Sequence, residues 1–323
     1  MMPHGLKALD VAFVLLIVVI IGVMVYVVCC DSSDPRVAEL RDKLDAVKRL
    51  NKERVKAQPP APPVDLVELN VAKWRAEYLA KHAIIGPYDA EGRHPVYWYA
   101  RLDGGLYGVE ETFIWIGYYL TSPEELKRES FRSGMEYALR HKGGALLNPC
   151  YNYIAMEMSH RYGGGPRRSG IKFYVFMMIA KWVDWTSPPI YVDGRFTAEG
   201  YAHPVMKPVA LVVRYAPHNP PRRDEIRERY NLGGVQFCRY FDPLAGSAPC
   251  KDAQELMGTF VVSKVLDDDR WHVKIDVSVS LNRTGLYTFE LIAEDLRAQN
   301  LRAQNRKCVI MHYTVEVPSN RRT

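Results

Sequence analysis

The feature that most constrains this chain is an uncharged block that begins at Val11 and ends at Cys30. A bilayer core about 30 Å thick is crossed by roughly 20 apolar residues in a helix, and the block has that length. Its apolar residues run without a break instead of marking one helix face, as a buried core helix would. The block therefore predicts one transmembrane helix, with the lipid bilayer as its partner.

An uncleaved anchor fits the block better than a cleaved signal peptide. The apolar run is longer than a usual signal core, and Val27 and Val28 precede Cys29 where a cleavage site needs small residues. The topology signals disagree. One lysine, Lys7, precedes the block and a cluster of basic residues follows it, which taken alone favours a cytoplasmic C-terminal part. The cysteines, considered below, favour the opposite side.

The composition of the whole chain, with the block included, is ordinary. It is 48% hydrophobic and 25% charged, which argues against wholesale disorder and against a polytopic membrane protein. The net charge is +6, from 43 basic and 37 acidic residues, so we expect no nucleic-acid partner.

Residues 31–57 predict a charged helical stalk. Val37, Leu40, Leu44 and Val47 follow a 3-4-3 spacing, a short heptad seam. Two interpretations remain open: a weak parallel coiled coil that makes a homodimer, or a solitary solvated helix. Residues 58–64 are proline-rich and predict a stiff, extended linker that holds the folded part away from the membrane.

Residues 65–187 predict a domain of helices and a covered sheet. We expect a helix over residues 65–82 and another from its N-cap, Ser122, to about His141. Strands are expected over residues 151–158 and 171–182. The second is apolar on both faces, which is typical of a central strand covered on both sides. Together these elements indicate a layered α+β domain.

Several segments of this domain follow one another in an order that also occurs in a known protein family. They are ELNVAKWR (68–75), YDAEGRHP (88–95) with YAR (99–101), GVEE (108–111), SPEE (122–125), RH (140–141) and LLNPCY (146–151). This series resembles the CAP superfamily (cysteine-rich secretory proteins, antigen 5 and pathogenesis-related proteins) in its prokaryotic form. The resemblance implies an α-β-α sandwich with a cleft where two histidines and two glutamates can bind a divalent metal.

The resemblance also implies the site residues of this chain. The family glutamate falls at Glu110 or Glu111, the second histidine at His141, and Glu129 is a fourth candidate. The first family histidine falls at Pro87, which cannot ligate a metal. We therefore expect a degenerate cleft that serves shape or partner binding. In the alternative, His141 and Glu110 hold a metal such as zinc and activate water in a hydrolase of peptide or wall polymer.

Residues 188–323 predict an all-β domain. Strands are indicated over residues 209–215, 259–265, 271–281, 287–291 and 309–317, several of them with strict apolar–polar alternation. Such a set favours a β-sandwich and resembles the immunoglobulin-like modules of prokaryotic secreted proteins. The repeat LRAQN-LRAQN at 296–305 indicates an expanded loop.

The chain has six cysteines. Cys238 and Cys250 bracket a short loop and are expected to form a disulfide. Cys150 and Cys308 either pair across the two domains or stay buried as free thiols. An even number of cysteines beside an anchor favours an oxidising, extracytoplasmic location.

The sequence thus predicts an anchored extracytoplasmic protein of α+β class that binds an envelope polymer or a protein partner and is not an enzyme. The metal-dependent hydrolase is the alternative, and an accessory subunit of a larger membrane complex is a further one.

Overall fold

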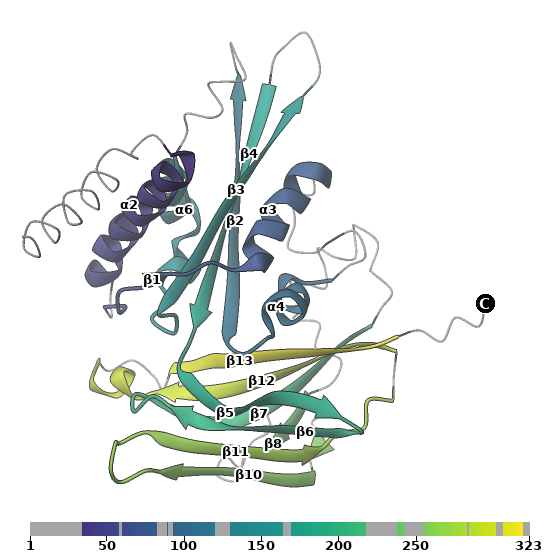
Figure 1. The fold of residues 1–323 in the computed structure, drawn as a ribbon. Coiled ribbons are helices and arrows are strands. Elements are labelled where there is room, and N and C mark those ends of the chain that lie inside the picture. The colour runs from purple at the N-terminus through teal and green to yellow at the C-terminus, as the bar shows by residue number, and fades with distance from the viewer. Residues whose placement is uncertain are drawn as a thin grey trace, which may run out of the picture.

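The computed structural model describes residues 34–57, 60–82, 89, 93–119, 130–163, 169–217, 238–241, 254–255, 257–282, 284–301 and 306–318. They form an α+β fold in two parts, a helix-covered sheet above two further sheets (Figure 1). The apolar block from Val11 to Cys30 lies outside these residues. None of the described helices has an apolar stretch long enough to span a membrane.

The first part is built on a four-stranded sheet with the order β1-β3-β4-β2. Its strands are β1 (Asp65–Leu66), β2 (Gly108–Tyr119), β3 (Tyr153–Gly163) and β4 (Ser169–Ala180). β1 runs parallel to β3, and the other pairs are antiparallel. The prediction that the second strand is central and covered is confirmed, because β4 lies between β3 and β2 and all of residues 173–180 are buried.

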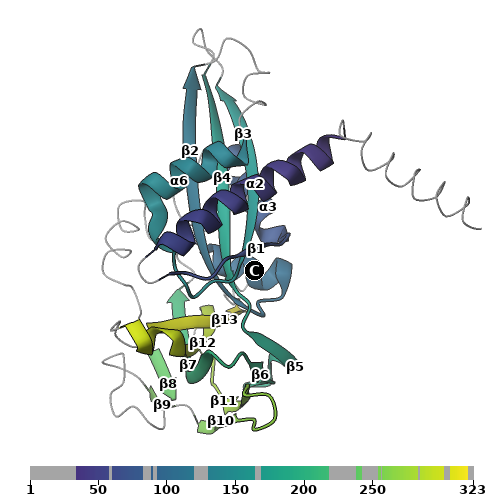
Figure 2. The ribbon, with the colours of Figure 1, turned by 90° about the vertical axis from the view of Figure 1, so that its left-hand side faces the viewer.

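Helices cover both faces of this sheet (Figures 1 and 2). They are α2 (Pro35–Lys56) and α6 (Phe131–Leu146) on one face, and α3 (Asn70–His82) and α4 (Pro95–Asp103) on the other. The side chains of β4 alternate accordingly. Tyr174 packs in the core on the α2 and α6 side, and Phe173 packs in the core on the α3 side.

The first predicted helix is shorter than expected. Residues 65–66 form β1, and α3 begins only at Asn70, where the carboxylate of Asp103 accepts the backbone N–H groups of Asn70 and Val71 at 2.9 Å each. This cap comes from the end of α4 and satisfies donors that a helix leaves open at its N-terminus.

The predicted stalk helix forms as α2, but its second half belongs to the folded body. Ala46 and Leu50 are buried in the core against α6 and the sheet, and Lys43 donates to Glu157 of β3 at 2.8 Å. The chain then folds back instead of extending, because Ala61 N–H donates to the carbonyl of Arg54 at 3.0 Å. In the structure this segment is therefore not a separate spacer. Of the seam residues, Val37, Leu40 and Leu44 stay exposed and Val47 is buried.

The second part consists of two sheets. One has the order β10-β11-β6-β5 and the other β13-β12-β7-β8-β9. The strands are β5 (Val183–Val192), β6 (Arg195–Ala202), β7 (Met206–Pro217), β8 (Cys238–Phe241), β9 (Gln254–Glu255), β10 (Met257–Lys264), β11 (Trp271–Ser278), β12 (Gly285–Asp295) and β13 (Arg306–Val317), with the 3-10 helix η1 (Leu296–Leu301) before β13.

The sheets form the sandwich-like arrangement that the alternating strands predicted. Phe196 of β6 stacks on Phe289 of β12 with ring centroids 4.2 Å apart, which joins the two sheets through aromatic packing. The hairpin of β5 and β6 was missed. Its turn residues Asp193 and Gly194 both have positive φ, 50° and 79°, as a tight Asp-Gly hairpin turn requires.

Candidate functional site at the junction of the two parts

One face of β13 joins the second part to the first. The disulfide between Cys308 and Cys150 lies at one end, and Glu316 lies at the other, where it accepts from the Tyr97 hydroxyl at 2.6 Å and from Arg101 at 3.1 Å. A β-bulge at Ile310 lies between these two ends, because Leu291 of β12 pairs with Met311 and the next residue, Ile292, pairs with Val309. β13 thus lies across the lower end of the helix-covered sheet along much of its length (Figure 1). Of the two alternatives for Cys150 and Cys308, the structure shows the disulfide.

Two glycines allow the backbones to approach at the middle of β13. A Cβ on Gly108, the first residue of β2, would lie 1.9 Å from the carbonyl oxygen of Val309. A Cβ on Gly105 would lie 2.7 Å from the carbonyl oxygen of His312, and Gly105 has a φ of +65°. Only glycine fits the first position without a backbone shift, so the start of β2 is built against β13.

A buried polar cluster lies beside this contact. Glu290 of β12 and His312 of β13 are directly opposite each other in the sheet, and both are buried. Arg214 of β7 donates from Nε to Glu290 at 2.7 Å, and His312 Nε2 lies 3.8 Å from the other oxygen of Glu290. On its far side, His312 accepts the backbone N–H of Val109 at Nδ1, at 2.9 Å.

The burial of this cluster sets its protonation. Burial, followed by the charge of Arg214, lowers the pKa of His312 to about 3, so the imidazole is neutral near pH 7. A neutral Nδ1 is what accepting the Val109 N–H requires. Burial also raises the pKa of Glu290, against the opposing effect of Arg214.

Glu110 reaches the same cluster from the first part. The hydroxyl of Tyr151 donates to the Glu110 carboxylate, and the pKa of Tyr151 is raised by burial first and then by the charges of Glu110 and Glu290. The carboxylates of Glu110 and Glu290 thus both act on Tyr151, while Arg214, whose side chain is 42% exposed, reaches Glu290 from the solvent side. Such groups can hold and exchange protons. They lie between the two parts of the chain, however, and none of them lines the cavity of about 470 Å³ beside the disulfide.

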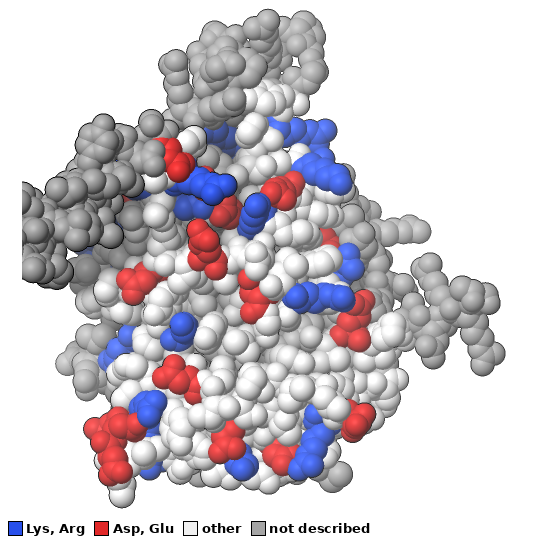
Figure 3. Space-filling model, in the orientation of Figure 1, with Lys and Arg blue, Asp and Glu red and all other residues white. Residues whose placement is uncertain are grey.

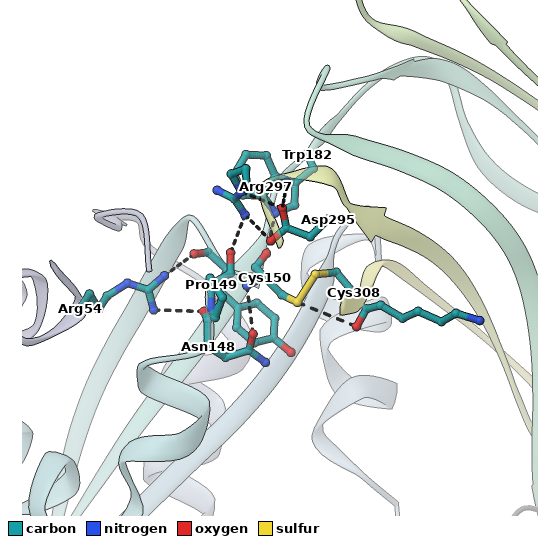
Figure 4. Close-up of a disulfide and its surroundings, with 10 residues drawn as sticks. Arg54, Asn148, Pro149, Cys150, Trp182, Asp295, Arg297 and Cys308 are labelled. Atoms are coloured by element: carbon teal, nitrogen blue, oxygen red, sulfur yellow. Dashed lines mark hydrogen bonds and ion pairs between the residues drawn. A yellow bond between two sulfur atoms is a disulfide. The ribbon is translucent and has the colours of Figure 1, made fainter. Parts of the chain in front are cut away.

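The loop that carries Cys150 is fixed by two arginines (Figure 4). Arg54 of α2 is fully buried and donates to the carbonyls of Pro62, Leu146, Asn148 and Tyr151. Burial, and then the charge of Arg297, lowers its pKa to about 10. Arg297 of η1 stacks on Trp182, donates to the carbonyl of Pro149 at 2.9 Å and pairs with Asp295 at 2.8 Å. The disulfide is thus set in a loop whose backbone is held from both parts.

The structure separates the residues of the predicted cleft. Glu110 and Glu111 are successive residues of β2 and so point to opposite faces of the sheet. Glu111 pairs with Arg75 of α3 at 3.1 Å, with both side chains buried, and His141 is exposed on α6 with its ring near Tyr137. The structure therefore does not bring Glu110, Glu111 and His141 together in one cleft.

Two further predicted residues lie outside the described part of the chain: Glu129 and Cys250. The Cys238–Cys250 disulfide stays a prediction. Within the described ranges, no three residues among histidine, cysteine, aspartate and glutamate form a group that could hold a metal ion. On the face drawn in Figure 3, basic and acidic residues are interspersed over both parts.

Sequence reasoning missed most of the junction. Arg54, Arg214 and Arg297 bind backbone carbonyls or a carboxylate far away in sequence, which leaves no local pattern to recognise. His312 and Glu290 lie on strands whose side chains alternate between the sandwich core and the opposite face, and both belong to the opposite face. This alternation was the one signal available in the sequence.

Neither a comparison with protein-family models nor one with curated proteins returned a match to this chain. Membership of the CAP superfamily therefore stays a prediction from the sequence.

Proposed function

We propose that this chain is a single-pass, membrane-anchored extracytoplasmic protein whose folded part is a rigid binding or structural module. The observation that carries the proposal is the Cys150–Cys308 disulfide, which ties the two parts of the body to each other. Structural disulfides persist in oxidising compartments and are rare in the cytosol. The apolar block from Val11 to Cys30 supplies the anchor, and an envelope polymer or a protein is the expected partner.

A non-catalytic role is supported by how the acidic and basic groups are used. Glu111 is paired with Arg75, and Glu110 is hydrogen-bonded to Tyr151 within the first part. Glu290 and His312 bond to strands of the two parts and lie between them. Glu111 thus stabilises the packing of α3 on the first sheet, and His312 bonds across the contact between the two parts. Groups committed to such contacts are not available to bind substrate or to position a water molecule.

The hydrolase alternative needs His141 and Glu110 to act on one water molecule or one metal ion. His141 is exposed on α6 whereas Glu110 is held by Tyr151, so the described contacts favour the binding module. An accessory role in a larger membrane complex would use the same anchored body and differs only in the partner.

Topology is tested by adding a membrane-impermeant protease to intact cells that express the full chain. We expect the body to be digested while a cytoplasmic marker stays intact. Protection of the body until the membrane is permeabilised would overturn the proposed location. Metal analysis of the purified full chain distinguishes the binding module from the hydrolase. Stoichiometric zinc that is lost on His141→Ala would favour the hydrolase instead.

A further inference from the structure

The outer edge of β2 is a second feature without an assigned role. β2 is the last strand of its sheet, and among the described residues no strand pairs with its outer side (Figure 2). Its junction with β13 involves the Gly108 end. The following residues 112–119, TFIWIGYY, contain no charge and no proline. An edge strand of this length and composition invites pairing with another strand.

One large side chain on this stretch is accessible, whereas Thr112 and Ile114 are buried. Trp115 is 45% exposed although tryptophan is a large apolar residue. A Cβ on Gly117 would meet no atom within 4 Å among those described. Trp115 and Gly117 lie on the same face of β2, so this part of the edge strand presents an apolar side chain next to an open position.

Two other edges of this molecule carry features that discourage pairing. The opposite edge of the same sheet, β3 beyond its short pairing with β1, carries Glu157, His160 and Arg161. β5 contains Pro188 and Pro189 and two register shifts. Charges, prolines and irregularities are the usual protections of an edge strand, and residues 112–119 have no charge or proline.

We propose that β2 pairs antiparallel with β2 of a second copy of this chain. A two-fold axis at Trp115 places residues 112–118 opposite themselves, with one Trp115 beside the other on the same face of the joined sheet. In this register no glutamate of β2 faces another glutamate. The uncharged stretch can therefore pair with a copy of itself without charge repulsion. A charged partner strand would find no opposite charge on it.

The expected contact is small. A single pair of strands buries less than the roughly 1,000 Å² typical of a stable interface, so the dimer is weak in dilute solution. Anchoring of both copies in one membrane would raise their effective concentration and favour the pair. The pairing itself does not depend on which side of the membrane the body occupies.

The test uses the full chain purified in detergent, with its mass measured by light scattering over a range of concentrations. We expect a monomer–dimer equilibrium that Trp115→Lys weakens at least tenfold, because a lysine on an edge strand opposes pairing. The matched control is Tyr162→Lys on β3, the opposite edge, where the tyrosine is 43% exposed. This variant should dimerise like the unchanged chain. Leu40→Lys tests the exposed seam of α2 separately.

A crosslinking experiment gives the register. Trp115→Cys should form an inter-chain disulfide between the two copies of residue 115 under mild oxidation, identified by peptide mapping, and Tyr162→Cys should not. The proposal is overturned if the unchanged chain is monomeric at all concentrations, if Trp115→Lys dimerises normally, or if Leu40→Lys alone abolishes the dimer. In those cases the edge is covered by another segment or is left unpaired.

Discussion

Substituting Gly108 by alanine perturbs the junction at its tightest point. The added Cβ would lie 1.9 Å from the carbonyl oxygen of Val309 and 2.7 Å from its carbon, whereas real Cβ contacts stay above 3.0 Å. The two backbones must then separate by about 1 Å. β13 resists this shift because Cys308 is bonded to Cys150 and His312 is bonded to Val109 N–H. Overpacking of a well-packed interior typically costs about 1–3 kcal/mol. Since the clash is with backbone, we expect the upper end, about 3 kcal/mol.

The assay is urea unfolding of the full chain in detergent, followed by circular dichroism. The matched control is Gly117→Ala on the same strand, where the Cβ meets nothing within 4 Å. That variant should lie within about 0.5 kcal/mol of the unchanged chain, since alanine also restricts the unfolded state. If Gly108→Ala unfolds at the same urea concentration as Gly117→Ala, the close packing of β2 on β13 is wrong.

Three further changes test the contacts around the junction. Replacing Cys150 and Cys308 together by serine should lower the free energy of unfolding by up to roughly 5 kcal/mol, because the bond closes a loop across a separation of 158 residues. Acidification below about pH 6.5 should destabilise the body. The unfolded chain then binds a proton at His312, whereas in the folded chain the pKa of His312 is about 3 and its imidazole stays neutral. At pH 5 this amounts to about 2 kcal/mol from His312, and His312→Asn, whose side-chain oxygen can accept from Val109, should remove that part of the pH dependence. Glu111→Gln should cost about 3–5 kcal/mol, because it leaves the buried charge of Arg75 without its carboxylate.

Each of these has an outcome that contradicts it. The disulfide contributes little if the double serine variant unfolds at the same denaturant concentration as the oxidised chain. The role of neutral His312 is refuted if His312→Asn keeps the full pH slope between pH 7 and 5. A raised pKa of Glu290 acts with the opposite sign, since its proton is favoured in the fold, so the comparison must be made between the two chains at each pH. The Arg75 pair is not a stabilising contact if Glu111→Gln and the exposed control Glu77→Gln have equal stability.

The parts of the fold with a local pattern were predictable from the sequence. β4 is apolar on both faces because helices cover both sides, and β12 and β13 alternate because each has one face in the sandwich core. β2 was not predicted because the adjacent charges of Glu110 and Glu111 interrupt the apolar pattern near its start. The β5–β6 hairpin was also missed, although the Asp193-Gly194 pair was a usable turn signal.

The candidate site was less predictable because its contacts join distant parts of the chain. Val109 and His312 are 203 positions apart, and Asp103 caps a helix that begins 33 residues earlier. Glu110 and Glu111 were alternatives for one family position, and the alternation of a strand sends these neighbours to opposite faces of the sheet. Arg54 was counted with the solvated charges of the stalk, yet it is buried against four carbonyls that no side-chain pattern reveals.

The central claim is that the folded part is one disulfide-locked body held outside the cytoplasm by its N-terminal anchor. The most direct measurement is the thiol state of the full chain in its own membrane. Cells are quenched with acid, free thiols are alkylated, and the chain is digested and mapped by mass spectrometry without reduction. We expect linked peptides that contain Cys150 and Cys308, with neither residue alkylated. Recovery of both residues as alkylated free thiols would contradict it.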